Sequence, residues 1–358
     1  MNPCAPANHR RRLLGLALAG GWFALGGRAW AAKAASASYV SRPEVQDFAG
    51  DTADRFGLEM AWVQSALASG RHCEAAARWM AAPSSPSQDW HRFRQGQIDA
   101  HKLARGLSFW WKYQDALQQA QIRFGIDPEI VVAIIGIESG YGRVTGRFRT
   151  LDVLLTLAFD LPRRAGEYRE ELAQLLMLSH EQGTDPTRYL GSIAGAIGMP
   201  QFLPSSIRRY ALDFDEDGQI DLAHSARDAI GSVAHFLSGH GWRAGLPVMV
   251  MADLPDALIA AQASAGSTDS QTSWGQLQQL GARSDRELEA AEPVRLIGLR
   301  FIDERGRPGQ DLRAGTSNFE ALLGYNRSFF YAATVAELAR ELRRRYDADP
   351  PSDYSASG

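Results

Sequence analysis

Residues 127–142 read DPEIVVAIIGIESGYG, and this stretch decides the fold. The Asp-Pro pair at its start is typical of a helix N-terminus, because aspartate offers a capping side chain and proline suits the first turn. Residues 130–137 are apolar on every side of a helix, which predicts a helix buried on all sides. Gly140 lets the chain stop and turn. Glu138 therefore stands in the last turn of a buried helix.

Glu138 is a candidate proton donor. Burial in apolar surroundings disfavours the charged form of a carboxylic acid, so the group keeps its proton to a higher pH. The alternative is a glutamate that merely reaches solvent where the helix ends. Residues 195–206, GAIGMPQFLPSS, favour the catalytic interpretation, since a rigid loop of this kind presents Gln201 and backbone groups to a ligand. A structural turn between helices is the alternative for this loop.

Outward from this core the sequence pattern is mainly helical. Helix-like spacing of apolar residues predicts helices within 42–82, 90–123, 170–181, 226–238 and 319–346. Residues 293–301 alternate like a strand, and the pattern allows one small sheet at most. Residues 83–87 form a linker by composition, and the polar region 247–281 has weak patterning. The predicted fold class is mainly α (α+β), with a small α/β part.

The composition is that of an ordinary globular protein, with 358 residues, 45% hydrophobic and 22% charged. A formal net charge of −3 gives no basic footprint, which argues against nucleic acid as a partner. Residues 1–31 carry an arginine-rich start, an apolar run over 13–25 and an Ala-Trp-Ala site, which together predict a signal peptide. An uncleaved anchor is the alternative, although the run is short for a membrane span.

Removal of residues 1–31 deletes four arginines and no acidic residue, which changes the formal charge from −3 to −7. Residues 32–42 follow as a short leader. Cys4 precedes the apolar run, so there is no lipobox, and Cys73 is the only cysteine left in the mature chain. We therefore expect a soluble periplasmic protein with no disulfide and no integral membrane span in its mature form.

An acidic loop over residues 213–221, DFDEDGQID, has the opening pattern of an EF-hand, with glycine at the sixth position for the sharp bend. The oxygens at positions one, three, five and seven would come from Asp213, Asp215, Asp217 and the carbonyl of Gln219. Position twelve is His224 instead of glutamate. The pattern predicts a structural Ca²⁺ site. A metal-free acidic turn is the alternative, and a calcium sensor would need a second such loop.

Four motifs together resemble the B-type lytic murein transglycosylases: residues 137–143, 195–206, 213–221 and Tyr325-Asn326. The likeness runs from Phe48 to Tyr346. It implies a lysozyme-like catalytic core with an EF-hand-like loop, embraced by a helical domain built from both ends of the chain, and no organic cofactor. The implied parts are an N-terminal helical part 43–88, the core 89–246 with calcium loop 213–228, a small α/β insertion 247–318, a C-terminal helix 319–348 that returns to the core, and a tail 349–358.

The resemblance also implies a reaction on the glycan strands of peptidoglycan. The β-1,4 bond between N-acetylmuramic acid and N-acetylglucosamine would be cleaved with Glu138 as the catalytic acid. Glycosidases usually use two carboxylates, and no second acid occupies a motif position beside Glu138. That fits attack by the muramic acid's own 6-hydroxyl, with Glu138 then acting as base, to give a 1,6-anhydro end. A goose-type muramidase that uses water, and a catalytically silent wall-binding protein, are the alternatives.

The remaining site residues are implied by the resemblance alone. Polar contacts to the sugars would come from Ser192, Gln201, Tyr325 and Asn326. An arginine pair placed to meet acidic peptide stems or lactyl groups would be Arg163 and Arg164, for which a solvated helix start is the alternative. Rings that stack on sugars, where some relatives carry tyrosine, would be Phe93 and Phe236. The carboxylate that closes the lengthened calcium loop would be Asp228.

Overall fold

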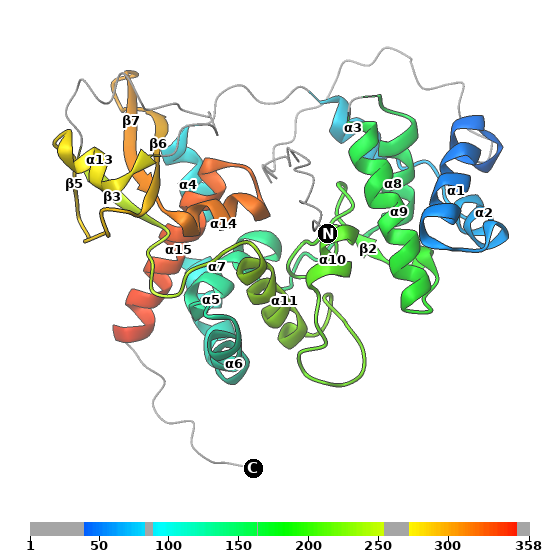
Figure 1. Cartoon of the computed structure of the whole chain (residues 1–358), viewed down its shortest axis with the longest axis horizontal. Coiled ribbons are helices and arrows are strands. Elements are labelled where there is room, and N and C mark those ends of the chain that lie inside the picture. Colours follow the sequence, from blue (N-terminus) through cyan, green and yellow to red (C-terminus); the bar gives the residue numbers. More distant parts are fainter. Residues whose placement is uncertain (1–38, 83–88, 163, 254–271, 349–358) are drawn as a thin grey trace, which may run out of the picture.

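The structure is a computed structural model that describes residues 39–82, 89–162, 164–253 and 272–348. It is mainly helical with a small sheet, which confirms the predicted fold class (Figure 1). The helices are α1 (Pro43–Phe56), α2 (Met60–Ala68), α3 (Glu74–Ala81), α4 (Trp90–Gln97), α5 (Ala100–Lys112), α6 (Gln114–Phe124), α7 (Pro128–Ser139), α8 (Thr150–Phe159), α9 (Ala165–Glu181), α10 (Pro204–Tyr210), α11 (Ala226–Gly239), α13 (Trp274–Gln279), α14 (Ser317–Tyr325) and α15 (Phe329–Ala348). The strands are β1 (Phe148–Arg149), β2 (Leu190–Gly191), β3 (Met249–Asp253), β4 (Thr272–Ser273), β5 (Arg283–Ser284), β6 (Pro293–Ile302) and β7 (Pro308–Gly315).

Helix α7 lies at the centre of the larger core, as its sequence predicts. Residues 130–136 are all buried. The helix ends where Gly140 adopts a left-handed conformation with φ +60° and donates its backbone N–H to the carbonyl of Gly136. The expected aspartate cap is wrong: the Asp127 side chain makes no capping hydrogen bond and instead accepts one from Gln121 Nε2 at 3.3 Å. A neighbouring side chain competes with the backbone for this carboxylate.

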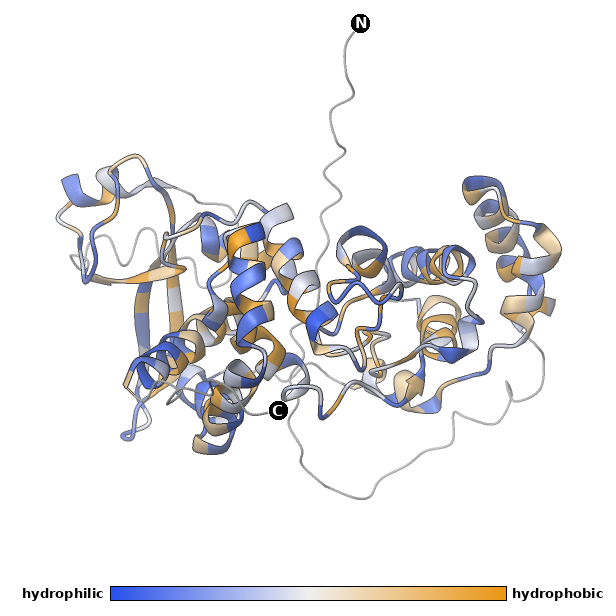
Figure 2. Cartoon of the chain, turned by 90° about the horizontal axis from the view of Figure 1, so that it is seen from below, coloured by the Kyte–Doolittle hydropathy of each residue, from blue (hydrophilic) through white to orange (hydrophobic). Residues whose placement is uncertain are grey.

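Most of the described helices pack into two hydrophobic clusters. The first surrounds α7 and includes residues of α5, α6, α11, α14 and α15, while the second joins α1, α2 and α3 to α8 and α9. In Figure 2 the two groups stand side by side, and hydrophobic and hydrophilic segments alternate along their helices. The resemblance implied one helical domain made from both chain ends. Instead the ends pack into different clusters, because α8 and α9 supply the apolar surface for the N-terminal helices.

The sheet is larger than the sequence suggested. Five antiparallel strands lie in the order β4-β6-β7-β3-β5, and β1 and β2 form a second, two-stranded sheet. The prediction of one small sheet at most is therefore wrong, although the expected strand is present as β6. Strand β7 reads PGQDLRAG and lacks clear alternation; its eight residues pair with β6 from Arg295↔Gly315 to Ile302↔Pro308. Tertiary pairing creates this strand where local pattern does not.

Two loops meet beside the C-terminal end of α7. Residues 140–147 follow the helix, and residues 191–203 form a folded loop with bridges from Ile197 to Gly191 and to Phe202. A Cβ on Gly146 would lie 2.0 Å from the backbone carbon of Gly191, so only glycine lets the loops come this close. The expected C-terminal helix is broken at residues 326–328 into α14 and α15. This break places Asn326 beside the same loops.

Within the ranges that the structure describes, no helix is both long enough and apolar enough to cross a membrane. The predicted signal peptide, residues 1–31, most of the leader and the tail 349–358 lie outside those ranges.

Candidate active site

Two adjoining cavities meet at Glu138. The first, called the α9 cavity, is lined by side chains of α9, by the loop 194–206 and by α14; the second, called the 143–148 cavity, is lined by that segment, Ser192 and α4. Four residues line both cavities: Trp79, Glu138, Gln201 and Asn326. Glu138 therefore lies where the two cavities adjoin, accessible to a ligand in either of them.

Surrounding protein raises the pKa of Glu138 to about 7 from its ordinary value of 4.5. Loss of solvation is the main cause, although part of the side chain still faces the cavities. The nearby Tyr331 hydroxyl and the positive charge of Lys102 lower the pKa and only partly offset this effect. Among the described residues no arginine or lysine forms an ion pair with this carboxyl group. Glu138 can therefore hold a proton near neutral pH, as the sequence predicts.

The turn after Glu138 is fixed by its neighbours. The buried Ser139 hydroxyl donates to the carbonyl of Ile135 at 3.1 Å and accepts the backbone N–H of Gly142 at 3.0 Å. Tyr141 has φ +65° and lies against Gly136, where a Cβ would come within 2.5 Å of the tyrosine hydroxyl oxygen. This packing ties the turn to the helix that carries Glu138 and so fixes the backbone on both sides of that residue.

Gln201 is held in a strained backbone conformation with φ +50°. Its side-chain Nε2 donates to the carbonyl of Gly198 at 2.8 Å and to that of Thr145 at 3.2 Å. Both amide hydrogens are thus used: the bond to Gly198 lies within the loop 191–203, and the bond to Thr145 joins this loop to the loop 140–147. The amide oxygen is left to accept a hydrogen bond from a ligand in either cavity.

The break between α14 and α15 supplies a second polar group. Asn326 is 6% exposed, and its Oδ1 has no hydrogen-bond partner among the described residues. A buried acceptor without a partner is costly, which favours a ligand donor at this position. Tyr325, beside it, donates its buried hydroxyl to the backbone carbonyl of Pro200. The Tyr325 ring lies 4.8 Å from that of Phe236, which lines the α9 cavity.

The other predicted contacts line the 143–148 cavity. The Ser192 hydroxyl oxygen accepts the backbone N–H groups of Ala194 and Ala196, which leaves its hydrogen free to donate. Phe93 packs against Phe330 with ring centroids 5.5 Å apart and faces the cavity at its edge. The structure thus gathers around Glu138 every sugar-contact residue that the resemblance implied and that it describes.

The resemblance implied that Arg163 and Arg164 are placed to meet acidic groups of the ligand. Arg164 lines the α9 cavity, but Glu167, one turn along the same helix, already forms an ion pair with it through two hydrogen bonds. Its charge is therefore partly neutralised before any ligand arrives. Arg163 lies outside the described residues.

Sequence reasoning missed Trp79, Lys102 and the role of Tyr331. Trp79 sits on α3, in the other hydrophobic cluster, and nothing in its local sequence indicates that it reaches Glu138. Lys102 donates to Gln97 Oε1 at 3.1 Å and acts on Glu138 through its charge. The Tyr331 hydroxyl lowers the pKa of Glu138, and Tyr331 also lines the 143–148 cavity. These three residues come from three segments distant from Glu138 in sequence, so only the fold could reveal them.

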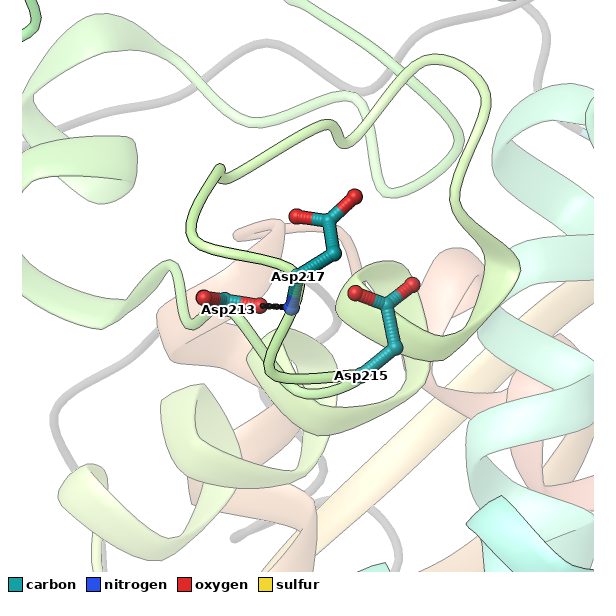
Figure 3. Close-up of side chains that lie close together, drawn as sticks. All are labelled: Asp213, Asp215 and Asp217. Carbon is teal, nitrogen blue, oxygen red and sulfur yellow. Dashed lines mark hydrogen bonds between the residues drawn. The ribbon is translucent and has the colours of Figure 1, made fainter.

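The acidic loop brings three of its predicted ligands together (Figure 3). Oxygen atoms of Asp213, Asp215 and Asp217 lie within 4.8 Å of one another. Asp213 accepts the backbone N–H groups of Asp217 and Gly218, which curls the loop around the carboxylates. Glycine at this bend has φ +90°. Hard carboxylate oxygens at this spacing fit Ca²⁺.

Asp228 does not join this group, contrary to the implied role. It is 1% exposed, and its carboxylate accepts backbone N–H groups of Phe214 and Asp221 at 2.8 Å each, with a longer contact to Asp215 at 3.4 Å. The carboxylate is turned inward because the folded loop needs an acceptor for these buried donors. Asp228 therefore braces the loop. Gln219 donates its N–H to Asp217, and the role of its carbonyl stays a prediction.

Comparison with known proteins agrees with this geometry. The family model described as transglycosylase SLT domain matches residues 41–340. The chain is 34% identical over 311 residues to the membrane-bound lytic murein transglycosylase B of Escherichia coli K12. The aligned region covers 84% of this chain and 83% of that protein.

Solved structures give the same result. The catenated lytic transglycosylase SltB1 of Pseudomonas aeruginosa superposes with a TM-score of 0.79 at 35% identity, covering 86% of this chain and 99% of that one. The Escherichia coli lytic transglycosylase Slt35 in complex with calcium has a TM-score of 0.74 at 34% identity, covering 85% and 94%. With Glu138 at the junction of two cavities and these likenesses over most of its length, the chain belongs to the transglycosylase SLT domain family and is a lytic transglycosylase.

Proposed function

We propose that Glu138 is the single acid and base with which this lytic transglycosylase cleaves the β-1,4 bond between N-acetylmuramic acid and N-acetylglucosamine. The raised pKa at the junction of the two cavities is the observation that carries this assignment. Glu138 gives its proton to the leaving oxygen as the C1–O4 bond breaks. It then takes the proton of the muramic acid 6-hydroxyl as the C1–O6 bond forms. The result is a 1,6-anhydro end, with no water consumed.

The other carboxylates of the α9 cavity are already engaged, which supports a single catalytic glutamate. Glu171 is buried and accepts the N–H and the hydroxyl of Ser205. Glu167 pairs with Arg164 and Glu170 pairs with Arg55. Glu138 differs from these three in the partners of its carboxyl group. Among the described residues it has neither an ion-pair partner nor a backbone donor. A second carboxylate to activate water, as a muramidase mechanism of the two-acid type requires, is not offered by these three glutamates.

Mass spectrometry of digested sacculi tests the reaction. The wild-type protein is expected to release anhydromuropeptides, and products with reducing ends alone would identify a muramidase instead. Glu138→Gln is expected to lose at least 100-fold in rate, the lower range for a general acid. The matched control is Glu167→Gln, which alters a carboxylate of the same cavity and should keep most of the activity. Full activity in Glu138→Gln would refute the assignment.

For substrate binding we propose that Gln201, Asn326 and Ser192 hold the sugars by hydrogen bonds and that Phe93 and Phe236 pack against them. The free amide oxygens of Gln201 and Asn326 and the free hydroxyl hydrogen of Ser192 support this role. For Arg164 we propose contact with acidic groups of the peptidoglycan, for which Glu167 would have to yield its place. Arg163 is proposed for the same role from the sequence alone.

For the acidic loop we propose a structural Ca²⁺ site held by Asp213, Asp215 and Asp217, with the carbonyl of Gln219 as a further ligand. The cluster of three carboxylates and the calcium complex of Slt35 support it. Calcium should raise the melting midpoint, since a ligand that binds only the folded state stabilises it. Asp215→Asn should abolish that rise. Glu216→Gln, an equal change of charge outside the cluster, should retain it; a rise of equal size in both variants would count against the site.

For the cellular location we propose export to the periplasm, where peptidoglycan lies. The support is the arginine-rich, apolar and Ala-Trp-Ala pattern of residues 1–31. Detection of the processed chain in a periplasmic extract would test it.

A further inference from the structure

Trp79 is the one residue of the range 39–82 that lines the cavities around Glu138, and it lines both of them. It belongs to α3, which packs on α8 and lies beside it in Figure 1. The rest of α1, α2 and α3 faces the second hydrophobic cluster or solvent. The N-terminal helices thus reach the active site through a single aromatic side chain.

We propose that Trp79 is a substrate-contact residue: its ring packs on the sugar that bridges the two cavities. This proposal rests on the proposed function, because it takes a glycan as the ligand. The two rings proposed above to pack against sugars, Phe93 and Phe236, belong to the first hydrophobic cluster, and each lines only one cavity. Trp79 comes from the second cluster and would contact the glycan strand where the two cavities join.

The ring is presented by a short helix with firm attachments at its start. The backbone N–H of Cys73 donates to Thr156 Oγ1 at 2.8 Å, and the His72 imidazole Nδ1 lies 2.7 Å from Asp160 Oδ2. The same Asp160 carboxylate accepts the hydroxyl of Tyr39 at 2.6 Å. These contacts fix α3 against the C-terminal half of α8. Trp79, in the last turn of α3, is therefore held at a set distance from α8 while its side chain extends to the cavities.

The chemistry suits a hexosamine ring. An indole offers a large, flat apolar surface that loses little conformational freedom when it is covered, and the C–H face of a sugar ring can lie against it. Hydroxyl and N-acetyl groups at the ring edge remain free to bond Gln201 and Asn326, which share both cavities with Trp79. Apolar packing on Trp79 and hydrogen bonds to Gln201 and Asn326 would together set the depth of the sugar relative to Glu138.

Three variants separate this role from a structural one. Trp79→Leu keeps an apolar side chain without a flat ring, and Trp79→Phe keeps a ring. Trp62→Leu is the control, because Trp62 is a half-buried tryptophan of the neighbouring helix α2 that lines neither cavity. Glycan strands freed of their peptides are the substrate. We expect Trp79→Leu to raise KM about tenfold, the size of one lost aromatic contact, with a smaller change in kcat. Trp79→Phe should recover most of the affinity, and Trp62→Leu should leave KM unchanged.

Binding is then measured in the Glu138→Gln background, where cleavage does not consume the strands. The same glycan strands should bind Glu138→Gln about tenfold more tightly than the Glu138→Gln/Trp79→Leu double variant. Equal affinities, or a KM for Trp79→Leu equal to that of the wild type, would overturn the role of Trp79. Trp79→Phe serves as the folded reference should Trp79→Leu melt early. If Glu138→Gln still cleaved, the proposed function would fail, while the KM values of Trp79→Leu and Trp79→Phe in the otherwise wild-type protein would still report on Trp79.

Discussion

The Tyr325 hydroxyl donates a hydrogen bond to the backbone carbonyl of Pro200, the residue before Gln201. This contact joins the last residue of α14 to the loop that carries the strained glutamine, across 125 positions of sequence. Around it lie Phe202 and Phe236, with ring centroids 5.7 and 4.8 Å from that of Tyr325. The C-terminal helices thus take part in holding the polar side of the active site.

Tyr325→Phe should lower the free energy of unfolding by about 1–2 kcal/mol, because the buried Pro200 carbonyl loses its donor. It should also lower kcat, since Gln201 is less firmly placed. Urea unfolding and initial rates on glycan strands measure the two effects. Tyr346→Phe is the control, because the Tyr346 ring stacks on Trp110 and its hydroxyl has no hydrogen bond to the described residues. Equal effects in both variants would show that the Pro200 contact is unimportant.

Activity should depend on the protonation of Glu138. Its pKa of about 7 means that the proton donor is present below pH 7 and is lost as the pH rises through that value. We expect kcat/KM to fall about tenfold per pH unit well above 7. Lys102→Met removes a positive charge that lowers this pKa, so the falling limb should move to higher pH. A pH profile that is the same in the two proteins would contradict the assignment.

The free energy of unfolding should also depend on the protonation of Glu138, and the direction of the effect follows from its pKa. The pKa of Glu138 is higher in the folded chain, about 7, than its ordinary value of 4.5, so the proton favours the folded state. This contribution is complete below pH 4.5 and is lost as the pH rises to 7. Glu138→Gln carries no such charge and should gain relative to the wild type over that interval, by about 3 kcal/mol at most. Chemical denaturation at pH 4.5, 6 and 8 gives the difference; a constant difference would rule out a buried, titrating Glu138.

Asp228→Asn should destabilise the acidic loop with or without calcium. The carboxylate accepts the buried N–H groups of Phe214 and Asp221, and an amide would place a donor against one of them. A loss of about 2 kcal/mol is expected. Asp221→Asn is the control, since among the described residues that carboxylate accepts only from Ala223 and His224. If chelator removed the entire effect of Asp228→Asn, Asp228 would act as a ligand and not as a brace.

Much of the helical framework could be predicted from the sequence. The apolar run 130–137 and Gly140 set α7 and its end, since both act through short-range sterics and burial. The EF-hand-like bend likewise depends on neighbours within six positions. Strand β7 could not be predicted, because its polar sequence becomes a strand only by pairing with β6. The roles of Asp127 and Asp228 were also misjudged, since each carboxylate had a competing partner that the motif did not show.

The sequence by itself determined the position of Glu138 in the last turn of a helix, and the apolar residues of that helix require it to be buried. Only the tertiary structure decided which carboxylates of the α9 cavity are committed elsewhere. Glu170 meets Arg55 across 115 positions and Glu171 meets Ser205 across 34, and no local pattern encodes such pairings. The physical reason is how far apart in the sequence the interacting residues lie. Helix ends and tight turns follow from contacts between near neighbours, whereas distant segments decide which carboxylates of the cavity form ion pairs, and those that the structure describes leave Glu138 without one.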